Sequence, residues 1–349
     1  MPVPEELSQR AKLILASVVA QYITTAEPVG SRTISKQENI DVSPATIRNV
    51  MLDLEEMGYL AQPHASAGRV PTTDGLRFYV DSILELGELD EQAQEIIREQ
   101  LQDKPLHDLS EIFKNTGRAL SSISRQAALV TAPSPEQEVF RHMEFILLAQ
   151  GLILVVLVAR SGSVQNRVIQ AEEDLTQEDL DKYSRYLNRL LADLTLSQVK
   201  RKVAREMAQE KNRFDKVLSR ALSLGQKAME TRLEGDLYIE GQTNLMAQPE
   251  FRDVARLRGI FQAFEEKSTL LRLLDKAMTA GGVRLFIGSE SELAELEGLS
   301  VVTSVYGKGN QSMGALGVIG PTRMDYAKVI PVVDFTARLV SRILNERAK

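Results

Sequence analysis

Cysteine is missing from all 349 residues of this chain. Its absence excludes disulfide bonds, thiol redox sensing and zinc sites built on cysteine. Histidine is scarce as well: His64, His107 and His142 are the only three, and they lie too far apart in the sequence to form a metal-ligand motif. A metal site built only from carboxylates remains an alternative, but no pattern indicates one, and we predict neither a metal site nor a cofactor.

Long apolar runs are also missing. A membrane-spanning helix needs roughly 18–20 consecutive apolar residues, and the longest candidate, residues 145–159, is interrupted by Gln150 and Gly151. No apolar stretch of signal-peptide type lies near the N-terminus, so we expect a cytoplasmic protein without a membrane partner. The net charge of −6 counts against a protein that coats nucleic acid non-specifically, but it is compatible with a small DNA-reading face.

The composition is that of an ordinary globular protein, with 43% hydrophobic and 26% charged residues. Because a single core rarely extends beyond roughly 250–300 residues, the length predicts two or three domains. Strand-like apolar runs form two groups, at residues 127–131, 140–159 and 164–169 and again at 283–287, 300–306 and 315–319. The residues between the groups, about 175–278, show mainly helical spacing. This order favours one α+β domain with an insertion, while two independent domains remain an alternative.

The N-terminal residues begin with two helix signatures. Residues 5–24 place apolar side chains at helical intervals, which predicts an amphipathic helix. Residues 27–30, Glu-Pro-Val-Gly, end it. Ser31 can then cap a second, short helix that carries Ile34.

A third helix has the clearest start and stop signals. Ser43 is a helix cap, Pro44 suits the first helical position, and Gly58 suits the left-handed residue after the last turn. One apolar stripe is formed by Ile47, Val50, Leu54 and Met57. The first exposed turns then carry small, hydrogen-bonding or cationic residues, namely Ala45, Thr46, Arg48 and Asn49. A helix that enters the major groove of DNA needs such residues at its N-terminus.

A short hairpin follows the third helix. Two strand-like pieces flank a tight tip within residues 59–72, and no acidic residue occurs from Ala61 to Thr73. Arg69 follows Gly68 and could reach a phosphate or the minor groove. Three helices and a hairpin in this order predict a winged helix-turn-helix. Each part alone has a plainer interpretation, because a capped helix is usually only a packed helix and a loop arginine is usually solvated.

Six stretches spread over nearly the whole chain are long and specific. They are EPVGSRT at 27–33, SPATIRN at 43–49, PHASAGRVPT at 63–72, RFYVD at 77–81, YIEGQTNL at 238–245 and GVIGPTRMDY at 317–326. These stretches resemble the HrcA family of heat-inducible transcription repressors. The resemblance implies a repressor, not an enzyme, that binds an inverted repeat called CIRCE upstream of chaperone operons. It also implies that activity depends on the chaperonin, which heat diverts to unfolded clients.

The resemblance also implies a three-part α+β architecture. We expect a winged helix-turn-helix at residues 1–80, a helical linker at 81–105, a GAF-like α+β domain at 106–174 and 268–349, and an inserted, mainly helical dimerisation domain at 175–267. A homodimer would read the two halves of the palindrome with two heads. The helical leucines from Leu187 to Leu194 belong to the expected dimerising region, although they could equally be domain core.

The candidate DNA-binding residues divide by role. Thr46, Arg48 and Asn49 would reach base edges, with Ala45 leaving room beside them. Phosphate or minor-groove contacts are assigned to Ser31, Arg32, Thr33, Ser43, His64 and Arg69.

Three other functions compete with this one. A repressor gated by a small ligand in the GAF-like domain is the first, although no convergent polar set identifies a pocket. An enzyme is the second, but the glycines at 307–309 and 314–317 lack phosphate-loop spacing, and Ser161, Ser163 and Ser312 have no evident base. A structural adaptor that merely contains a winged domain is the third.

Overall fold

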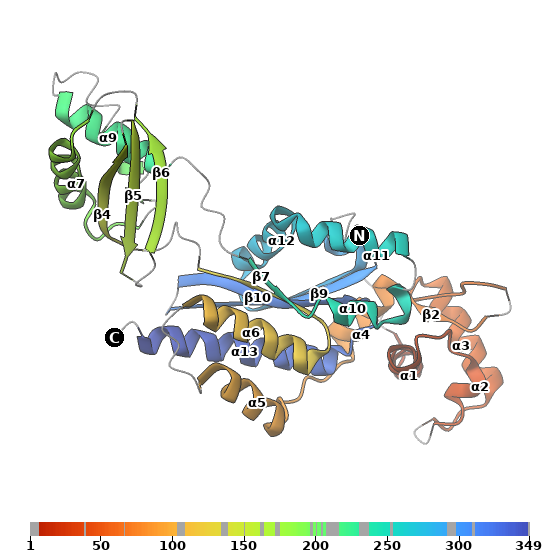
Figure 1. The fold of residues 1–349 in the computed structure, drawn as a ribbon. Helices are drawn as coiled ribbons and strands as arrows, with labels where there is room; N and C mark the ends of the chain where they lie inside the picture. Colours follow the sequence, from red (N-terminus) through yellow and green to blue (C-terminus); the bar gives the residue numbers. More distant parts are fainter. Residues whose placement is uncertain are drawn as a thin grey trace. The chain divides into compact units, whose positions relative to one another are not determined.

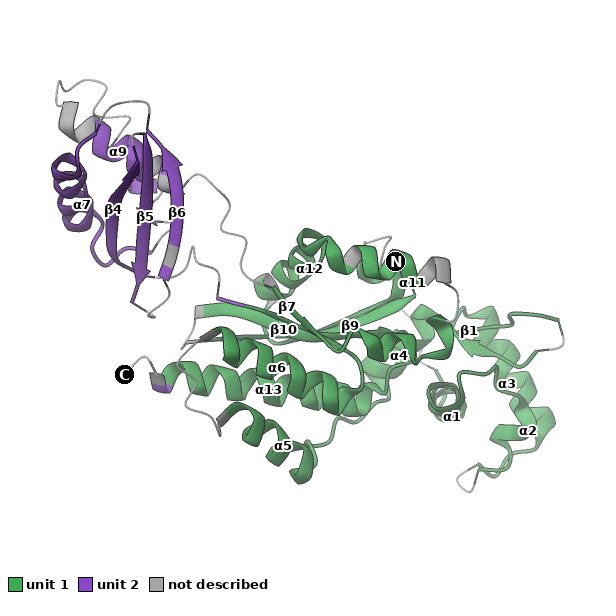
Figure 2. Cartoon of the chain, viewed as in Figure 1, with its two compact units in different colours: residues 1–131, 237–345 green, residues 132–236, 346–349 purple. Residues whose placement is uncertain are grey.

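The computed structural model of the chain describes residues 7–37, 40–65, 67–102, 109–133, 139–149, 151–160, 164–171, 175–195, 198–199, 201–203, 205–206, 216–229, 237–251, 254–291, 298–308 and 311–347. The chain forms two compact units (Figure 2). Unit 1 comprises residues 1–131 and 237–345, and unit 2 comprises residues 132–236 and 346–349. Across the described ranges, no helix is long and apolar enough to cross a membrane.

Unit 1 begins with a small head of helices and a hairpin, residues 7–82. Its elements in chain order are α1 (Gln9–Thr25), α2 (Ser31–Ile34), α3 (Pro44–Glu56), β1 (Leu60–Ala61), β2 (Val70–Pro71) and α4 (Thr73–Ser82). Ser8 starts α1 by accepting a hydrogen bond from the Ala11 amide, and Thr72 starts α4 in the same way from Gly75. Strands β1 and β2 pair antiparallel, so Leu60 lies opposite Pro71.

The core of the head is formed where α1 meets α3. Ile14, Leu15 and Val18 of α1 are fully buried, as are Ile47 and Leu54 of α3. The expected stripe of α3 was partly wrong, because Met51 is buried whereas Met57 is 49% exposed. Met51 lies one turn from Ile47 and so shares its face, while Met57 follows the last helical residue and turns outward.

The rest of unit 1 is an antiparallel five-stranded sheet with helices on both faces, which we call the sheet domain (Figure 1). Its strands in spatial order are β7 (Leu237–Glu240), β3 (Ala127–Thr131), β10 (Gln311–Pro321), β9 (Leu299–Lys308) and β8 (Val283–Ile287). Its helical elements are α5 (Glu91–Gln102), α6 (Leu109–Ser124), α10 (Thr243–Met246), η2 (Pro249–Phe251), α11 (Val254–Glu265), α12 (Lys267–Ala280), η3 (Gly288–Ser291) and α13 (Tyr326–Arg347).

Each face of this sheet packs against its own helices. Leu273 and Leu274 of α12 join Leu129 of β3 and Ile319 of β10 in one buried cluster. On the other face, Phe113 of α6 stacks on Tyr306 of β9 with ring centroids 5.9 Å apart. The sheet domain is therefore a three-layered α+β structure.

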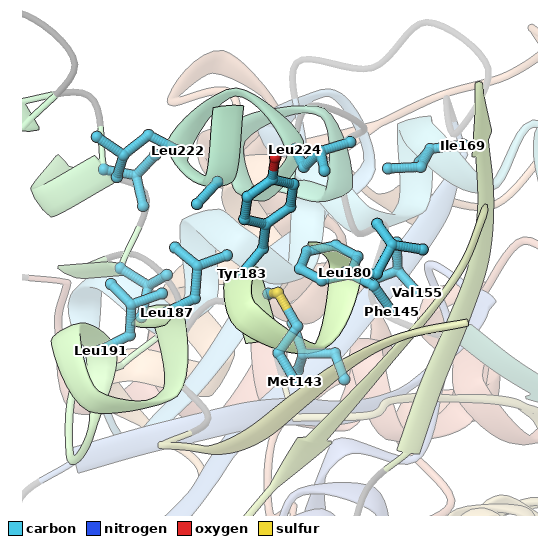
Figure 3. Packing of buried hydrophobic residues seen from close by; sticks show 14 of the residues in the cluster. Met143, Phe145, Val155, Ile169, Leu180, Tyr183, Leu187, Leu191, Leu222 and Leu224 are labelled. Atoms are coloured by element: carbon cyan, nitrogen blue, oxygen red, sulfur yellow. The ribbon is translucent and has the colours of Figure 1, made fainter. Parts of the chain in front are cut away.

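Unit 2 is a three-stranded antiparallel sheet with helices on one face. Its described elements are β4 (Phe140–Ala149), β5 (Leu152–Ala159), β6 (Val164–Gln170), α7 (Gln177–Leu191) and α9 (Lys216–Met229). Figure 3 shows how Met143 and Phe145 of the sheet meet Leu180, Tyr183 and Leu187 of α7. Leu187 and Leu191 are fully buried there, so these leucines are domain core.

The strands expected from sequence are all present, but they join different sheets. Residues 127–131 form β3 of the sheet domain, whereas residues 140–170 supply the separate sheet of unit 2. Unit 2 therefore begins before the inserted segment that we expected at 175–267, because residues 140–170 add a sheet to the helices α7 and α9. Alternation of apolar residues predicts a strand but does not say which neighbours will pair with it.

Candidate DNA-binding head

The N-terminus of α3 is organised by one serine. Ser43 Oγ accepts a hydrogen bond from the Thr46 amide at 3.2 Å and lies 2.9 Å from Thr46 Oγ1. Arg48 and Asn49 are exposed on the next positions, and Ala45 is exposed beside them. Thr46 is half-buried and its hydroxyl is shared with Ser43, so Arg48 and Asn49 supply the exposed hydrogen-bonding groups of this turn.

The end of α3 confirms the role expected of Gly58. Its φ angle is +82°, in the left-handed region that favours glycine. The chain then turns into β1, and Thr72 Oγ1 donates a hydrogen bond to the Gly58 carbonyl at 2.6 Å. This hydrogen bond connects the hairpin to Gly58, just after the end of α3.

The short helix α2 precedes α3 and exposes two polar side chains. Arg32 and Thr33 are exposed and Ser31 is half-buried. The cap of α2 is Gly30, not Ser31 as we expected, because the Gly30 carbonyl accepts from the amides of Thr33 and Ile34 and makes Ser31 the first helical residue. Lys36, which we did not single out, is exposed just after α2 and adds a cation near Arg32.

The hairpin is a short wing with an ordered base. Val29 and Arg69 exchange backbone hydrogen bonds of 2.8 and 2.9 Å, which tie the wing to the turn before α2. Gln62 Nε2 donates to the carbonyls of Ala65 and Ala67, each at 3.0 Å. His64 is exposed at the tip.

Arg69 does not extend freely from the wing. Its guanidinium contacts Glu55 in the last turn of α3, with Nε 2.8 Å and Nη2 2.7 Å from Glu55 Oε2. Only 13% of the Arg69 side chain is exposed. The ion pair braces the wing against α3, so a direct contact of Arg69 with DNA is the least supported of the contacts that we expected. Glu55 was not predicted as the partner of Arg69 because the two residues lie fourteen positions apart in the sequence. The one signal for the pair was that Glu55 precedes a wing that contains no acidic residue.

The glycine and serine motifs that could suggest an enzyme lie elsewhere. Gly307 is part of β9, and Gly314 and Gly317 are part of β10. A Cβ at Gly317 would lie 2.3 Å from the Val302 carbonyl oxygen, so close strand packing explains this glycine. Ser161 and Ser163 lie outside the described residues.

Three helices, the third capped by Ser43, followed by a two-stranded wing, have the element order of a winged helix-turn-helix. Two known proteins are similar to this chain over nearly its whole length. The heat-inducible transcription repressor HrcA of Geobacter sulfurreducens is 49% identical over 339 residues, which are 97% of this chain and 98% of that protein. The heat-inducible transcription repressor HrcA of Syntrophobacter fumaroxidans is 50% identical over 343 residues, 98% of each chain.

Two further comparisons agree. Residues 110–330 match the family model described as HrcA protein C terminal domain. A crystal structure of a hypothetical protein is similar in fold, with a TM-score of 0.64 and 24% identity over 98% of this chain and 100% of the other. The chain belongs to the HrcA family. Its relatives are named as repressors, which agrees with the expectation that the chain is not an enzyme.

Proposed function

We propose that this protein represses transcription of heat-shock chaperone operons by binding an inverted-repeat operator as a homodimer. The observation that supports this most directly is the N-terminus of α3, where Arg48 and Asn49 are exposed on a helix fixed by Ser43. A helix end of this kind fits the major groove of B-DNA, which admits one helix and presents a distinct pattern for each base pair.

The side chains suggest which contacts carry sequence information. Arg48 can donate two hydrogen bonds to guanine O6 and N7, and Asn49 can pair with adenine N6 and N7. The polar residues around them would hold phosphates and fix the register, without reading sequence. This second group comprises Ser31, Arg32, Thr33, Ser43 and His64, with Arg69 acting mainly through the wing. Thr46, which we expected at a base edge, joins this group because its hydroxyl is shared with Ser43.

The homodimer would form through unit 2. Its helices cover one face of the sheet. The other face carries apolar side chains on all three strands, with polar ones among them, namely His142, Glu144, Asn166 and Gln170. Ile146 lies opposite Leu154, and Leu154 lies opposite Val168. Val168 and Val164 are 53% and 62% exposed, respectively. Soluble proteins rarely leave such a patch open, and a two-fold axis through it would cover the same surface on both copies.

Edge pairing through β4 is a poorer route to the dimer. Three side chains of α7 accept hydrogen bonds from backbone amides of β4, at Met143, Phe145 and Leu147, with distances of 2.7, 3.2 and 2.8 Å. Amides that are already paired cannot add a strand from a second chain. The open sheet face is therefore the surface that we assign to dimerisation.

The remaining assignments follow from family membership. We propose that the operator is the CIRCE inverted repeat, that the sheet domain is the GAF-like domain, and that the protein acts in the cytoplasm with chaperonin as a second partner. The residues of the head set only the type of contact, so the operator sequence must come from binding measurements.

The test is an anisotropy titration at fixed salt with a CIRCE palindrome and a scrambled duplex of equal length, with and without chaperonin and ATP. Specific operators typically bind about 10³-fold or more tighter than random DNA. A ratio of that order supports the repressor, and a further gain with chaperonin supports the second partner. Equal affinity for both duplexes would contradict the proposal, provided that circular dichroism shows folded protein.

A further inference from the structure

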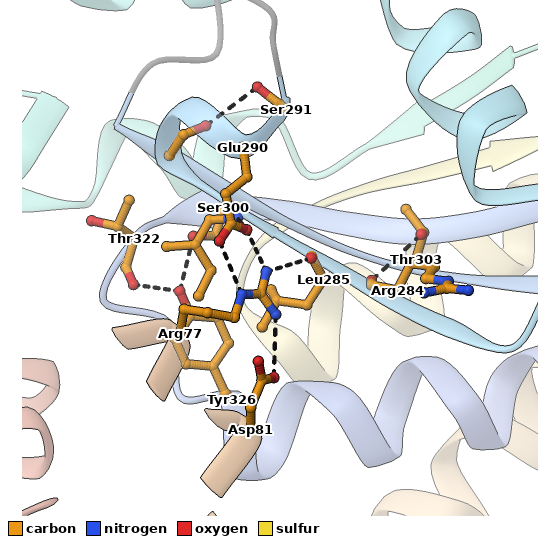
Figure 4. Close-up of polar contacts among 12 residues, drawn as sticks. Arg77, Asp81, Arg284, Leu285, Glu290, Ser291, Ser300, Thr303, Thr322 and Tyr326 are labelled. Atoms are coloured by element: carbon orange, nitrogen blue, oxygen red, sulfur yellow. Dashed lines mark hydrogen bonds and ion pairs between the residues drawn. The ribbon is translucent and has the colours of Figure 1, made fainter. Parts of the chain in front are cut away.

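Two arginines outside α3 connect the head to the sheet domain. The first is Arg77 of α4, shown in Figure 4, whose guanidinium is bidentate on Glu290 in η3. Its Nε lies 2.9 Å from Glu290 Oε1, and Nη2 also donates to the Leu285 carbonyl at 2.7 Å. Hydrogen bonding to Glu290 raises the pKa of Arg77 above its ordinary value, so the guanidinium stays charged in this pair.

Glu290 is itself held in place. Its Oε2 accepts a hydrogen bond of 2.8 Å from the Ile287 amide at the end of β8. A Cβ added to Gly288 would lie 3.2 Å from Thr73 Oγ1, which shows how closely the start of α4 approaches this turn. The backbone of the sheet domain thus holds the Glu290 carboxylate in position for Arg77.

The second arginine belongs to the sheet domain and extends toward the head. Arg323, in the turn between β10 and α13, is bidentate on Glu250 and also donates to Gln248 Oε1 at 2.9 Å. Its Nη1 donates to the carbonyl of Ile23 in the last turn of α1, at 2.9 Å. Carbonyls in that turn lack partners within the helix, and a cation there is favourable. Only 12% of the Arg323 side chain is exposed.

The two connections are reciprocal. Arg77 extends from the head to the sheet domain, whereas Arg323 extends from the sheet domain to the head. Each guanidinium makes a bidentate contact with a carboxylate and also donates to a backbone carbonyl of the other part of unit 1. This geometry fixes the direction of the contact between the two parts as well as its distance. Because both pairs are half-buried or deeper, salt screens them less than it screens exposed pairs.

We infer that Arg77 and Arg323, with Glu290 and Glu250, form a lock that sets the orientation of the DNA-binding head on the sheet domain. They are positioning residues, which touch no base or phosphate in the proposed complex. Neither α3 nor the wing supplies any of them, so the DNA-reading function leaves these four side chains unexplained. The inference rests on the proposed function.

The lock has a specific consequence for a palindrome. Two heads reach both half-sites at once only when their orientation matches the half-site spacing. With a fixed head, the second half-site is bound at high effective concentration, and a loosened head loses part of that gain. A single half-site needs no such match, so the lock leaves its affinity unchanged.

The test uses the full-length protein and three variants of the lock. They are Arg323→Gln, Arg77→Glu, and Arg77→Glu combined with Glu290→Arg, which restores the pair with reversed charges. The matched control is Arg338→Gln, which breaks an exposed pair on α13 whose arginine side chain is 72% exposed. Each protein is titrated against a full palindrome and against a duplex with one half-site, and its unfolding is followed by scanning calorimetry.

Arg323→Gln and Arg77→Glu should weaken palindrome binding by about tenfold or more while half-site binding stays within about twofold. The charge-reversed double variant should recover part of the palindrome affinity, because the ion pair forms again while the hydrogen bonds to the Leu285 carbonyl and from the Ile287 amide do not. Arg338→Gln should match the wild type. Unchanged or tighter palindrome binding in both single variants would overturn the inference, and so would equal loss on both duplexes without recovery in the double variant.

Calorimetry separates this inference from the proposed function. If the wild type shows no preference for the palindrome, the proposed function fails, yet the lock is still tested. Unfolding of the head ahead of the sheet domain in the single variants, but not in Arg338→Gln, supports the lock. A single coincident transition in every variant would overturn it.

Discussion

Arg69 and Glu55 join the wing to α3, with Arg69 Nε 2.8 Å from Glu55 Oε2. Arg69, which we expected from the sequence to contact DNA, thus already forms an ion pair with a carboxylate of the same head. We therefore expect Arg69 to affect DNA binding through the position of the wing.

A double-mutant cycle tests that role. Arg69→Gln, Glu55→Gln and the double variant should weaken operator binding to a similar extent, because each change releases the same brace. The coupling energy should be about 1 kcal/mol, measured from dissociation constants on one duplex. Additive losses would show that Arg69 contacts DNA independently of Glu55.

Replacing Arg48 or Asn49 with alanine should affect specificity more than general affinity. Each change removes one exposed base-reading group from a helix whose cap and core are untouched. We expect a cost of about 1–3 kcal/mol on the operator and relaxed selection at one base pair, measured with a panel of single-base operator variants. Arg338→Ala is the control. Equal weakening on the operator and on random DNA would contradict base reading.

Gly68→Ala should disrupt the base of the wing. An alanine Cβ there would lie 2.4 Å from the Val29 carbonyl oxygen, inside the backbone bridge between Val29 and Arg69. We expect a loss of about 1–3 kcal/mol in unfolding free energy, measured by urea denaturation, with weaker binding to any duplex. Gly259→Ala is the control, since nothing lies within 4 Å of its added Cβ. A helix-interior alanine there should stabilise by up to about 1 kcal/mol, and a Gly68→Ala protein as stable as the wild type would refute the packing argument.

Val168→Glu should separate the dimer. The change places a charge in the middle of the open apolar face of unit 2, where Val168 pairs with Leu154. Sedimentation velocity should show a folded monomer with reduced palindrome affinity, because burial of an unpaired carboxylate opposes association. Arg185→Ala on the exposed surface of α7 alters net charge by the same amount and should remain dimeric. A dimer that survives Val168→Glu would place the interface elsewhere.

Tyr326→Phe tests the buried hydrogen bonds beside the lock. Ser300 Oγ lies 2.8 Å from the Tyr326 hydroxyl, which donates to the Thr322 carbonyl at 2.5 Å. Removing this hydroxyl should cost about 1–3 kcal/mol at neutral pH, because two polar partners lose their hydrogen bond.

The same tyrosine makes stability depend on alkaline pH. Burial raises the pKa of Tyr326 above its ordinary value. The folded state therefore holds this proton more tightly, so its contribution is complete below the unfolded pKa near 10 and is lost as the pH rises through the folded pKa. Denaturation from pH 9 upward should show a shallower decline in Tyr326→Phe than in the wild type. Identical slopes would mean that Tyr326 does not titrate with unfolding.

Helix caps and other local signals account for the parts of the fold that the sequence predicts well. Ser43, Pro44 and Gly58 mark the ends of α3 because capping and left-handed φ are properties of single residues and their neighbours. Residues 127–131 were expected as a strand and form β3 with those bounds. Strand β7 was not expected, since four residues within a helical stretch give too short an alternation to recognise.

Long-range pairing accounts for what sequence could not predict. Glu55 and Arg69, or Arg77 and Glu290, are unremarkable charges until the chain brings them together over 14 and 213 positions. The assignment of residues 140–170 to unit 2 is also a matter of partners, because the same alternation would serve in either sheet.

Hydroxyl-radical footprinting of the full-length protein on a palindromic operator tests the central claim most directly. The account predicts protected backbone patches in both half-sites, related by the dyad of the repeat and separated by about one helical turn or a multiple of it. The Arg48→Ala protein should leave both patches unprotected at a concentration at which the wild type saturates them. Protection that is absent, or that is uniform along the duplex and unaffected by Arg48→Ala, would contradict sequence-specific binding by this head.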